Sequence, residues 1–304
     1  VSLIQKLFAP AKAPPKFSTF VPAKGWSAVR VSVNLKDLFS GIGDAIPPVG
    51  ELEKAKSQIG MAPMMLPMVL GFGWDDLTGA LSGHVVVAFS GESVAKAAKG
   101  GGANFDGVVL LGVVDGAKAD KVVPDLLKQL DKVLPGGEIG ATTVGGHAGH
   151  QVKAGPLTLA VVRVDDVLVA GPLAAVEAAV KRPDGEHLTD KEAVAALDGA
   201  DVVEGVVYDV ASLAAMGGLA DTAQLTKLLG RPVFAGALRH DRHGLVTRSP
   251  AVGLAGMAGL AAGLALPAFT RYIALSKAAA EKIPAPLPEP LGAPVQVAPA
   301  SDAE

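Results

Sequence analysis

Hydrophobic and polar residues alternate with a period of two over residues 27–35, "SAVRVSVNL". One face of this segment carries valines and the other carries polar residues: Val29, Val31 and Val33 against Arg30, Ser32 and Asn34. Successive side chains of a strand point to opposite faces, so this alternation is typical of a strand with one face in the core. We therefore predict a half-buried strand whose valines face inward.

Further strands and helices follow along the chain. Residues 36–46 predict a short helix, and residues 83–91 and 105–116 are apolar runs that predict strands. Residues 117–137 have apolar side chains at helical spacing and end in Pro-Gly-Gly, which predicts a helix. Three strand candidates and a last helix come next: 142–152, 157–166, 167–171 and 172–185.

Two segments of the chain share one pattern. Residues 28–46 and 202–220 both read as a strand, a polar residue, a short Leu-bearing helix and a glycine pair, and each leads towards a later strand. We predict an α+β domain over residues 25–247, built of two related sheet-plus-helix units at 25–100 and 101–247. Proline-rich stretches flank the whole: an extended arm at 1–24 and a disordered tail at 284–304.

Residues 60–70, "GMAPMMLPMVL", contain four of the six methionines. Methionine is flexible and fills irregular gaps in cores, although a soft methionine face can also form an adaptable binding groove. We predict a core position for this segment, and Pro63 and Pro67 argue against one regular helix through it.

Composition and charge exclude several classes of function. The formal net charge is -3, which leaves no electrostatic footprint for nucleic acid. The absence of cysteine removes disulfides, thiolate metal sites and cysteine nucleophiles. Hydrophobic residues make up 50% of the chain but aromatic residues only 4%, a balance that fits packing of small residues better than aromatic ligand pockets.

Catalytic and metal-binding motifs are weak. The best metal-ligand candidates are the pairs His147 with His150 and His240 with His243, but residues three apart in a strand face opposite sides. The sequence has neither a Gly-x-Ser-x-Gly elbow nor a phosphate-binding glycine motif. We therefore expect no catalytic residue and no cofactor, with metal binding or enzymatic activity as a weaker alternative.

A charge-free run covers residues 249–270, between Arg248 and Arg271. As a helix, its 22 residues would rise about 33 Å, near the thickness of the hydrocarbon layer of a bilayer. Small residues recur at spacings of three and four, which allows close helix packing: Gly253, Gly256, Gly259 and Gly263. Because glycine disfavours an ordinary buried helix, we predict a membrane or assembly helix over 248–283, kinked at Pro267.

The segment "ALPAFTRYIALSKAAAEK" resembles the hydrophobic helix of bacterial type IV pilins and pseudopilins. The order of matching residues is Pro267, Phe269, Tyr272, Ser276 and Lys277. In that family the helix anchors the subunit in the membrane and packs in the filament core. It stands at the mature N-terminus there, whereas here it follows some 247 residues. The resemblance implies membrane anchoring or assembly.

A second resemblance covers roughly residues 20–240. The stretches "FVPAKGWSAVRVSVNLKDL", "WDDLTGALSGHVVVAFSG" and "VRVDDVLVAGPLAAVEAAVKRPDG" resemble bacterial envelope proteins of an uncharacterised α+β family. This resemblance implies a fold and an envelope location, and it implies no activity.

Together these features predict a non-catalytic, membrane-anchored protein of the bacterial cell envelope, with its α+β domain periplasmic or extracellular. Its expected partners are membrane lipid and, through the C-terminal helix, other copies of the chain. The alternative is a self-assembling filament or oligomer subunit.

Overall fold

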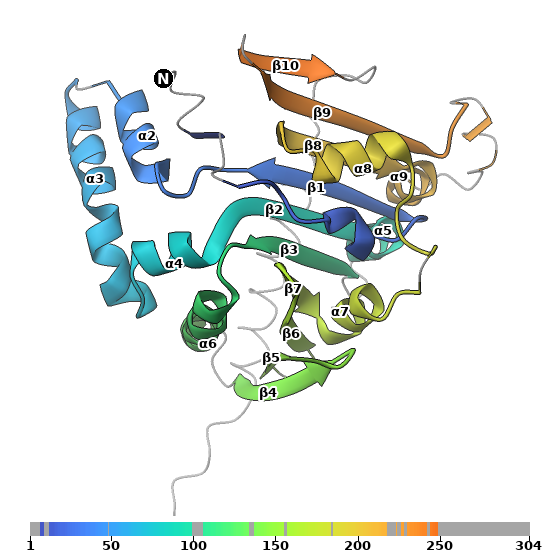
Figure 1. Ribbon diagram of the computed structural model, residues 1–304, viewed down its shortest axis with the longest axis horizontal. Helices are drawn as coiled ribbons and strands as arrows, with labels where there is room; N and C mark the ends of the chain where they lie inside the picture. Colours follow the sequence, from blue (N-terminus) through green and yellow to red (C-terminus); the bar gives the residue numbers. More distant parts are fainter. Residues whose placement is uncertain are drawn as a thin grey trace, which may run out of the picture. The chain divides into compact units, whose positions relative to one another are not determined.

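The computed structural model describes residues 7–8, 12–47, 49–98, 106–133, 137–154, 157–183, 185–217, 223, 226–227, 230–241 and 244–248 (Figure 1). The predicted helix at 248–283 and the predicted tail at 284–304 lie outside these residues, apart from Arg248.

One antiparallel sheet organises the described residues. Its strand order is β10-β9-β8-β1-β2-β3-β7-β6-β5-β4, and each neighbouring pair is antiparallel. The strands are β1 (Trp26–Ser32), β2 (Leu81–Ser90), β3 (Gly107–Val113), β4 (Glu138–Val144), β5 (His147–Ala154), β6 (Leu157–Val164), β7 (Val167–Pro172), β8 (Val202–Asp209), β9 (Val233–Asp241) and β10 (Gly244–Arg248). The sheet and its helices confirm the mixed helix-and-strand class expected from the sequence.

The two segments with the shared pattern both form a strand followed by a helix. Strand β1 leads into α2 (Leu38–Ala45), and β8 leads into α9 (Val210–Gly217). Each first strand pairs with the later strand of its own segment, β1 with β2 and β8 with β9. Strands β1 and β8 also pair with each other, so both segments belong to one continuous sheet.

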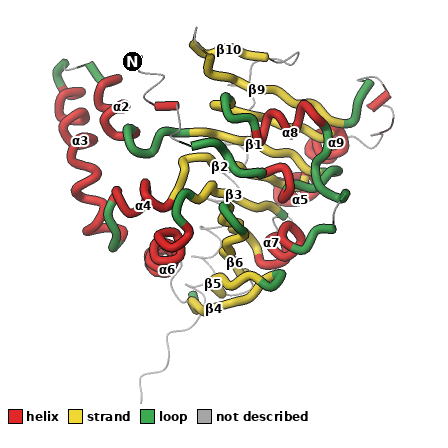
Figure 2. The backbone as a smooth tube through the Cα atoms, viewed as in Figure 1, coloured by secondary structure: helices red, strands yellow, loops and turns green. Residues whose placement is uncertain are grey.

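One face of the sheet is covered by α7 (Leu173–Val180), α8 (Lys191–Asp198) and a 3-10 helix, Phe17–Phe20. Helices α7 and α8 lie in front of the strands in Figure 2. The largest core cluster fills this side, and Phe17 and Val21 from the predicted N-terminal arm are 0% and 1% exposed within it.

The opposite face carries two smaller clusters. Helices α4 (Trp74–Ala80) and α6 (Gly116–Val133) cover one of them, and α9 covers the other with α5 (Gly91–Ala98) packed against it. Between these clusters the sheet is only partly covered, because Val31 on β1 and Val109 on β3 are each 36% exposed.

The burial of β1 is the reverse of the sequence prediction. Arg30 and Ser32 are 0% exposed, whereas Val31 lies on the partly exposed face. The prediction that the valines face the main core was wrong. It failed because the carbonyl groups at the end of α8 lie on the polar side of β1 and offer Arg30 its hydrogen-bond acceptors.

The methionine-rich segment is also placed differently. It belongs to α3 (Glu51–Leu70), a single helix that contains both Pro63 and Pro67, and it packs against α2, α4 and α6 beside the sheet. Its methionines are among the most exposed apolar side chains of the described residues: Met61 46%, Met64 70%, Met65 53% and Met68 79%. The predicted core position and the predicted break in the helix are both wrong.

The region 138–172 forms four strands where the sequence predicted three. The segment 142–152 crosses a tight turn between β4 and β5, in which Gly145 and Gly146 have φ values of 58° and 85°. Such left-handed conformations favour glycine, and a two-residue turn of this kind is typical of a β-hairpin. The glycine pair was therefore the signal for an additional strand.

Candidate functional site

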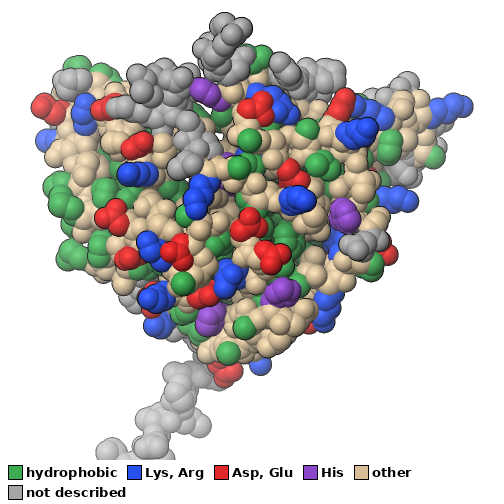
Figure 3. Space-filling model, viewed as in Figure 1, with side chains coloured by type: hydrophobic (Ala, Val, Ile, Leu, Met, Phe, Trp, Pro, Cys, Tyr) green, Lys and Arg blue, Asp and Glu red, His purple; other side chains and the backbone are tan. Residues whose placement is uncertain are grey.

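The exposed surface of α3 is the first candidate site. Met61, Met64, Met65 and Met68 follow the spacing i, i+3, i+4, i+7, so they form one stripe along the C-terminal half of the helix. We call these four residues the methionine stripe. Figure 3 shows hydrophobic side chains gathered at the left margin of the molecule, where α3 lies. No charged residue occurs in the sequence from 57 to 74, so the stripe is flanked by neutral residues.

A buried polar cluster centred on Arg30 is the second candidate. Arg30 Nη1 donates to the carbonyls of Leu197 and Gly199 at 2.7 and 2.8 Å, and Nη2 donates to Val202 O at 3.2 Å. Leu197 and Gly199 belong to the end of α8, where the last carbonyls of a helix lack intrahelical donors and carry partial negative charge. The guanidinium therefore caps α8 and joins it to the strand below.

Ser32 and His84 accept the remaining hydrogen bonds of this guanidinium. Arg30 Nε donates to Ser32 Oγ at 3.1 Å, and Arg30 Nη2 lies 3.1 Å from His84 Nδ1. A guanidinium has only donors, so Nδ1 of His84 is the acceptor and its proton sits on Nε2, which donates to Lys12 O at 2.8 Å. All five N–H groups of Arg30 thus have an acceptor.

Burial controls the charge states in the cluster. It lowers the pKa of His84 from 6.5 to about 4, with a smaller lowering by the adjacent Arg30, so the imidazole is neutral near pH 7. Burial also lowers the pKa of Arg30 to about 10, opposed by the nearby Asp198 and Asp201 carboxylates, and the guanidinium remains charged. With its donors used and its histidine neutral and 1% exposed, the cluster serves packing between β1, β2 and α8.

One feature of the sequence indicates this buried cluster. His84 stands at the start of the apolar run of β2, and a histidine inside a buried strand requires hydrogen-bond partners. Arg30 and Ser32, at alternate positions of another strand, could supply them. The strand register that places Ser32 opposite His84 is set by the tertiary fold, and the periodicity of the sequence does not predict it.

Three polar atoms form the third candidate: Glu204 Oε1, Tyr208 Oη and His240 Nε2, all shielded from solvent and without a hydrogen bond to any residue that the structure describes. Cross-strand register places the three side chains on the same face of β8 and β9. Burial raises the pKa of Glu204, and burial together with the Glu204 charge raises the pKa of Tyr208. Buried polar groups normally have partners, and among the described residues these three atoms have none.

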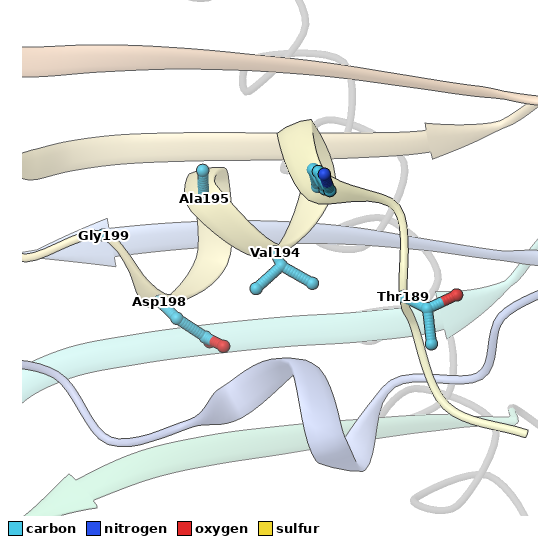
Figure 4. Close-up of a pocket in the computed structure, with 6 residues that line it drawn as sticks. Thr189, Val194, Ala195, Asp198 and Gly199 are labelled. Atoms are coloured by element: carbon cyan, nitrogen blue, oxygen red, sulfur yellow. The ribbon is translucent and has the colours of Figure 1, made fainter. Parts of the chain in front are cut away.

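A shallow hollow of about 350 Å³ lies along α8 (Figure 4). Its lining residues are Thr189, Lys191, Val194, Ala195, Asp198 and Gly199. The carboxylate of Asp198 accepts hydrogen bonds from Ser18 N at 3.0 Å and from Ser18 Oγ. Burial raises the pKa of Asp198 against the opposing effect of these bonds. The carboxylate therefore joins α8 to the 3-10 helix and is not a free acid or base in the hollow.

Of the two histidine pairs predicted as metal-ligand candidates, the structure describes only His147 with His150 in full, and these two side chains do not converge. His147 and His150 lie three residues apart on β5 and face opposite sides of the sheet, as the sequence predicted. His240 lies on β9, and His243 lies outside the described residues. Within the described part of the chain, no group of three His, Asp or Glu side chains is arranged to hold a metal ion.

The predicted helix-packing residues Gly253, Gly256, Gly259 and Gly263 and the predicted kink at Pro267 lie outside the described residues. Among the helices that the structure does describe, none combines the length and apolarity needed to cross a membrane.

Comparison of the chain with models of known protein families, with curated proteins and with solved structures gives no match.

Proposed function

We propose that this protein is a non-catalytic, membrane-anchored protein of the bacterial cell envelope, in which the α/β domain has a binding or structural role. The observation that carries the proposal is the charge-free run 249–270, which begins directly after Arg248, the last residue of β10. Twenty-two uncharged residues bounded by arginines have the length and flanks of a membrane-spanning helix.

The polar chemistry of the domain supports a binding or structural role. Arg30 and Asp198 have hydrogen-bond partners within the fold, and His84 is neutral and buried. Arg30 joins α8 to the sheet and Asp198 joins α8 to the 3-10 helix, which is the use expected of a scaffold. The exposed methionine stripe adds an apolar surface of the kind found at interaction sites.

We further propose that the domain arose as two related units and that it lies on the periplasmic or extracellular side of the membrane. Support for the units comes from two shared features: β1 and β8 each lead into a helix, α2 and α9, and each pairs with a later strand, β2 and β9. Support for the location comes from the resemblance of roughly residues 20–240 to bacterial envelope proteins.

Carbonate extraction of cell membranes tests the anchor. The full chain should stay with membranes washed at high pH, because a hydrocarbon-embedded helix is not released by breaking charge contacts. A double variant with Leu260→Lys and Leu264→Lys should move into the wash, since each charge in the centre of a span costs about 3 kcal/mol. The matched control has Leu260→Ile and Leu264→Ile. Release of the unmodified chain into the wash would refute the anchor.

A second candidate function, a subunit of an oligomer or filament, is favoured by the spacing Gly259-x-x-x-Gly263. Such spacing lets two membrane helices approach closely. Substituting both glycines by Leu should reduce the particle size in mild detergent. An unchanged size would exclude these glycines from a contact between subunits.

A further inference from the structure

The methionine stripe lies on the exposed side of α3, so packing in the core does not account for it. A side chain that is 70% or 79% exposed, as for Met64 and Met68, contributes little to the core. Met61 and Met65, which are 46% and 53% exposed, lie on the same side of the helix. Together the four residues form an apolar surface, and surfaces of this kind mark contact with a partner or a membrane.

The charges of α3 are separated along its axis. Glu53, Lys54 and Lys56 lie in its N-terminal half, and the sequence then has no charged residue until Asp75 at the start of α4. A protein partner that bound along the whole helix would meet charges at one end and methionines at the other. A bilayer has the same separation, with charged headgroups above an uncharged hydrocarbon layer.

The proposed anchor would keep the domain near lipid. The sequence after Arg248 begins with 22 uncharged residues. A membrane span that begins there would tether the domain to the bilayer, so that lipid would be present at high effective concentration.

We propose that the C-terminal half of α3 inserts its methionine stripe into the outer part of the lipid bilayer, as a second membrane contact of the anchored domain. The inference rests on the proposed anchor. Insertion removes four apolar side chains from water, and the flexible thioether side chains adapt to the irregular surface of the lipid chains.

The absence of cysteine from the chain allows a direct test, because a single introduced thiol can carry a fluorescent probe. Three full-length variants are labelled with an environment-sensitive fluorophore: Met64→Cys, Met68→Cys and, as a control on the same helix, Glu53→Cys. Position 53 lies 11 residues before position 64, about 16 Å along the axis. Each variant is reconstituted into vesicles of phosphatidylcholine and phosphatidylglycerol, with or without lipids bearing a quencher on the acyl chain.

The proposal expects lipid quenching at 64 and 68 to be at least threefold stronger than at 53, with the opposite order for quenching by aqueous iodide. If the protein floats with the vesicles but the lipid-borne quencher reduces the fluorescence at positions 64 and 68 no more than at position 53, the inference is overturned and the anchor is left intact. If the probes at positions 64 and 68 are shielded from both the lipid-borne quencher and iodide, the inference is also overturned. That result would mean that a second copy of the chain, or another part of the same chain, covers the methionine stripe. Failure to float with vesicles would refute the anchor itself, and with it the inference.

Discussion

Arg30 on β1 and His84 on β2 meet inside the protein with 3.1 Å between Nη2 and Nδ1, a charged group beside an imidazole that burial keeps neutral. The pair lies under the end of α8, whose carbonyls accept two further hydrogen bonds from the same guanidinium. One buried cation therefore connects β1, β2 and the end of α8.

Replacing Arg30 with Met should lower the free energy of unfolding by about 3–5 kcal/mol. The substitution removes a buried charge but leaves Leu197 O and Gly199 O without donors. Denaturant unfolding in mild detergent measures the change. Arg163→Met is the matched control, because Arg163 pairs with Asp120 at the surface and should cost less than about 1 kcal/mol. Similar losses in the two variants would contradict the capping role of Arg30.

Stability should fall as the pH decreases from about 6.5 to about 4. In this window the unfolded chain binds a proton at His84 and the folded chain does not, since the pKa of His84 in the fold is about 4. The total loss should be roughly 3 kcal/mol. Burial raises the pKa of Glu204 and of Asp198, which stabilises the fold relative to the unfolded chain as these groups protonate and offsets part of the loss.

Measuring the unfolding midpoint against pH for the protein and for His84→Gln isolates the histidine. The amide of Gln does not titrate in this range, so the difference between the two curves should shrink towards pH 4. Parallel curves from pH 7 to pH 4 would show that His84 is not the group responsible.

Tyr208→Phe should leave stability unchanged or raise it by about 1–2 kcal/mol. The hydroxyl of Tyr208 is buried and has no hydrogen-bond partner among the described residues, and removing an unpaired polar atom removes its desolvation cost. Ser27→Ala is the contrasting variant, because the Ser27 hydroxyl bonds to Ser212 at 3.0 Å and its loss should destabilise the protein. A large destabilisation by Tyr208→Phe would show that this hydroxyl has a partner in solution.

Replacing Met64 and Met68 together with Gln should change the free energy of unfolding by less than about 1 kcal/mol. Both side chains are exposed, and exposed substitutions rarely exceed about 0.5 kcal/mol each. Leu127→Ala, at a position only 4% exposed, should cost about 2–5 kcal/mol in the same assay. A loss of free energy of unfolding of that size in the methionine variant would show that Met64 and Met68 are packed in the core.

Periodicity identified the strands and helices more reliably than it identified their buried faces. It located β1, α2, β2, β3 and α6 close to their bounds. Alternation along β1 assigned the valines to the core, because apolar residues usually face inward. The buried side instead holds Arg30, which depends on the carbonyls of a helix about 170 residues away.

The prediction for the methionine-rich segment was wrong for a related reason. Proline inside a helix costs about 3 kcal/mol, so Pro63 and Pro67 argued for a break. Helix α3 nevertheless continues through both prolines, packed on α2, α4 and α6. The unpartnered atoms of Glu204 and Tyr208 depend on what surrounds them in space, and no local pattern of residues reports that.

Flotation of the purified full chain with lipid vesicles on a density gradient is the decisive measurement for the membrane anchor. We expect the protein to rise with the vesicles at both low and high salt, because its attachment is a hydrocarbon-embedded helix. We also expect the variant with Leu260→Lys and Leu264→Lys to stay at the bottom. An unmodified chain that stays at the bottom of the gradient at both salt concentrations would contradict the claim that residues 249–270 anchor this protein in a membrane.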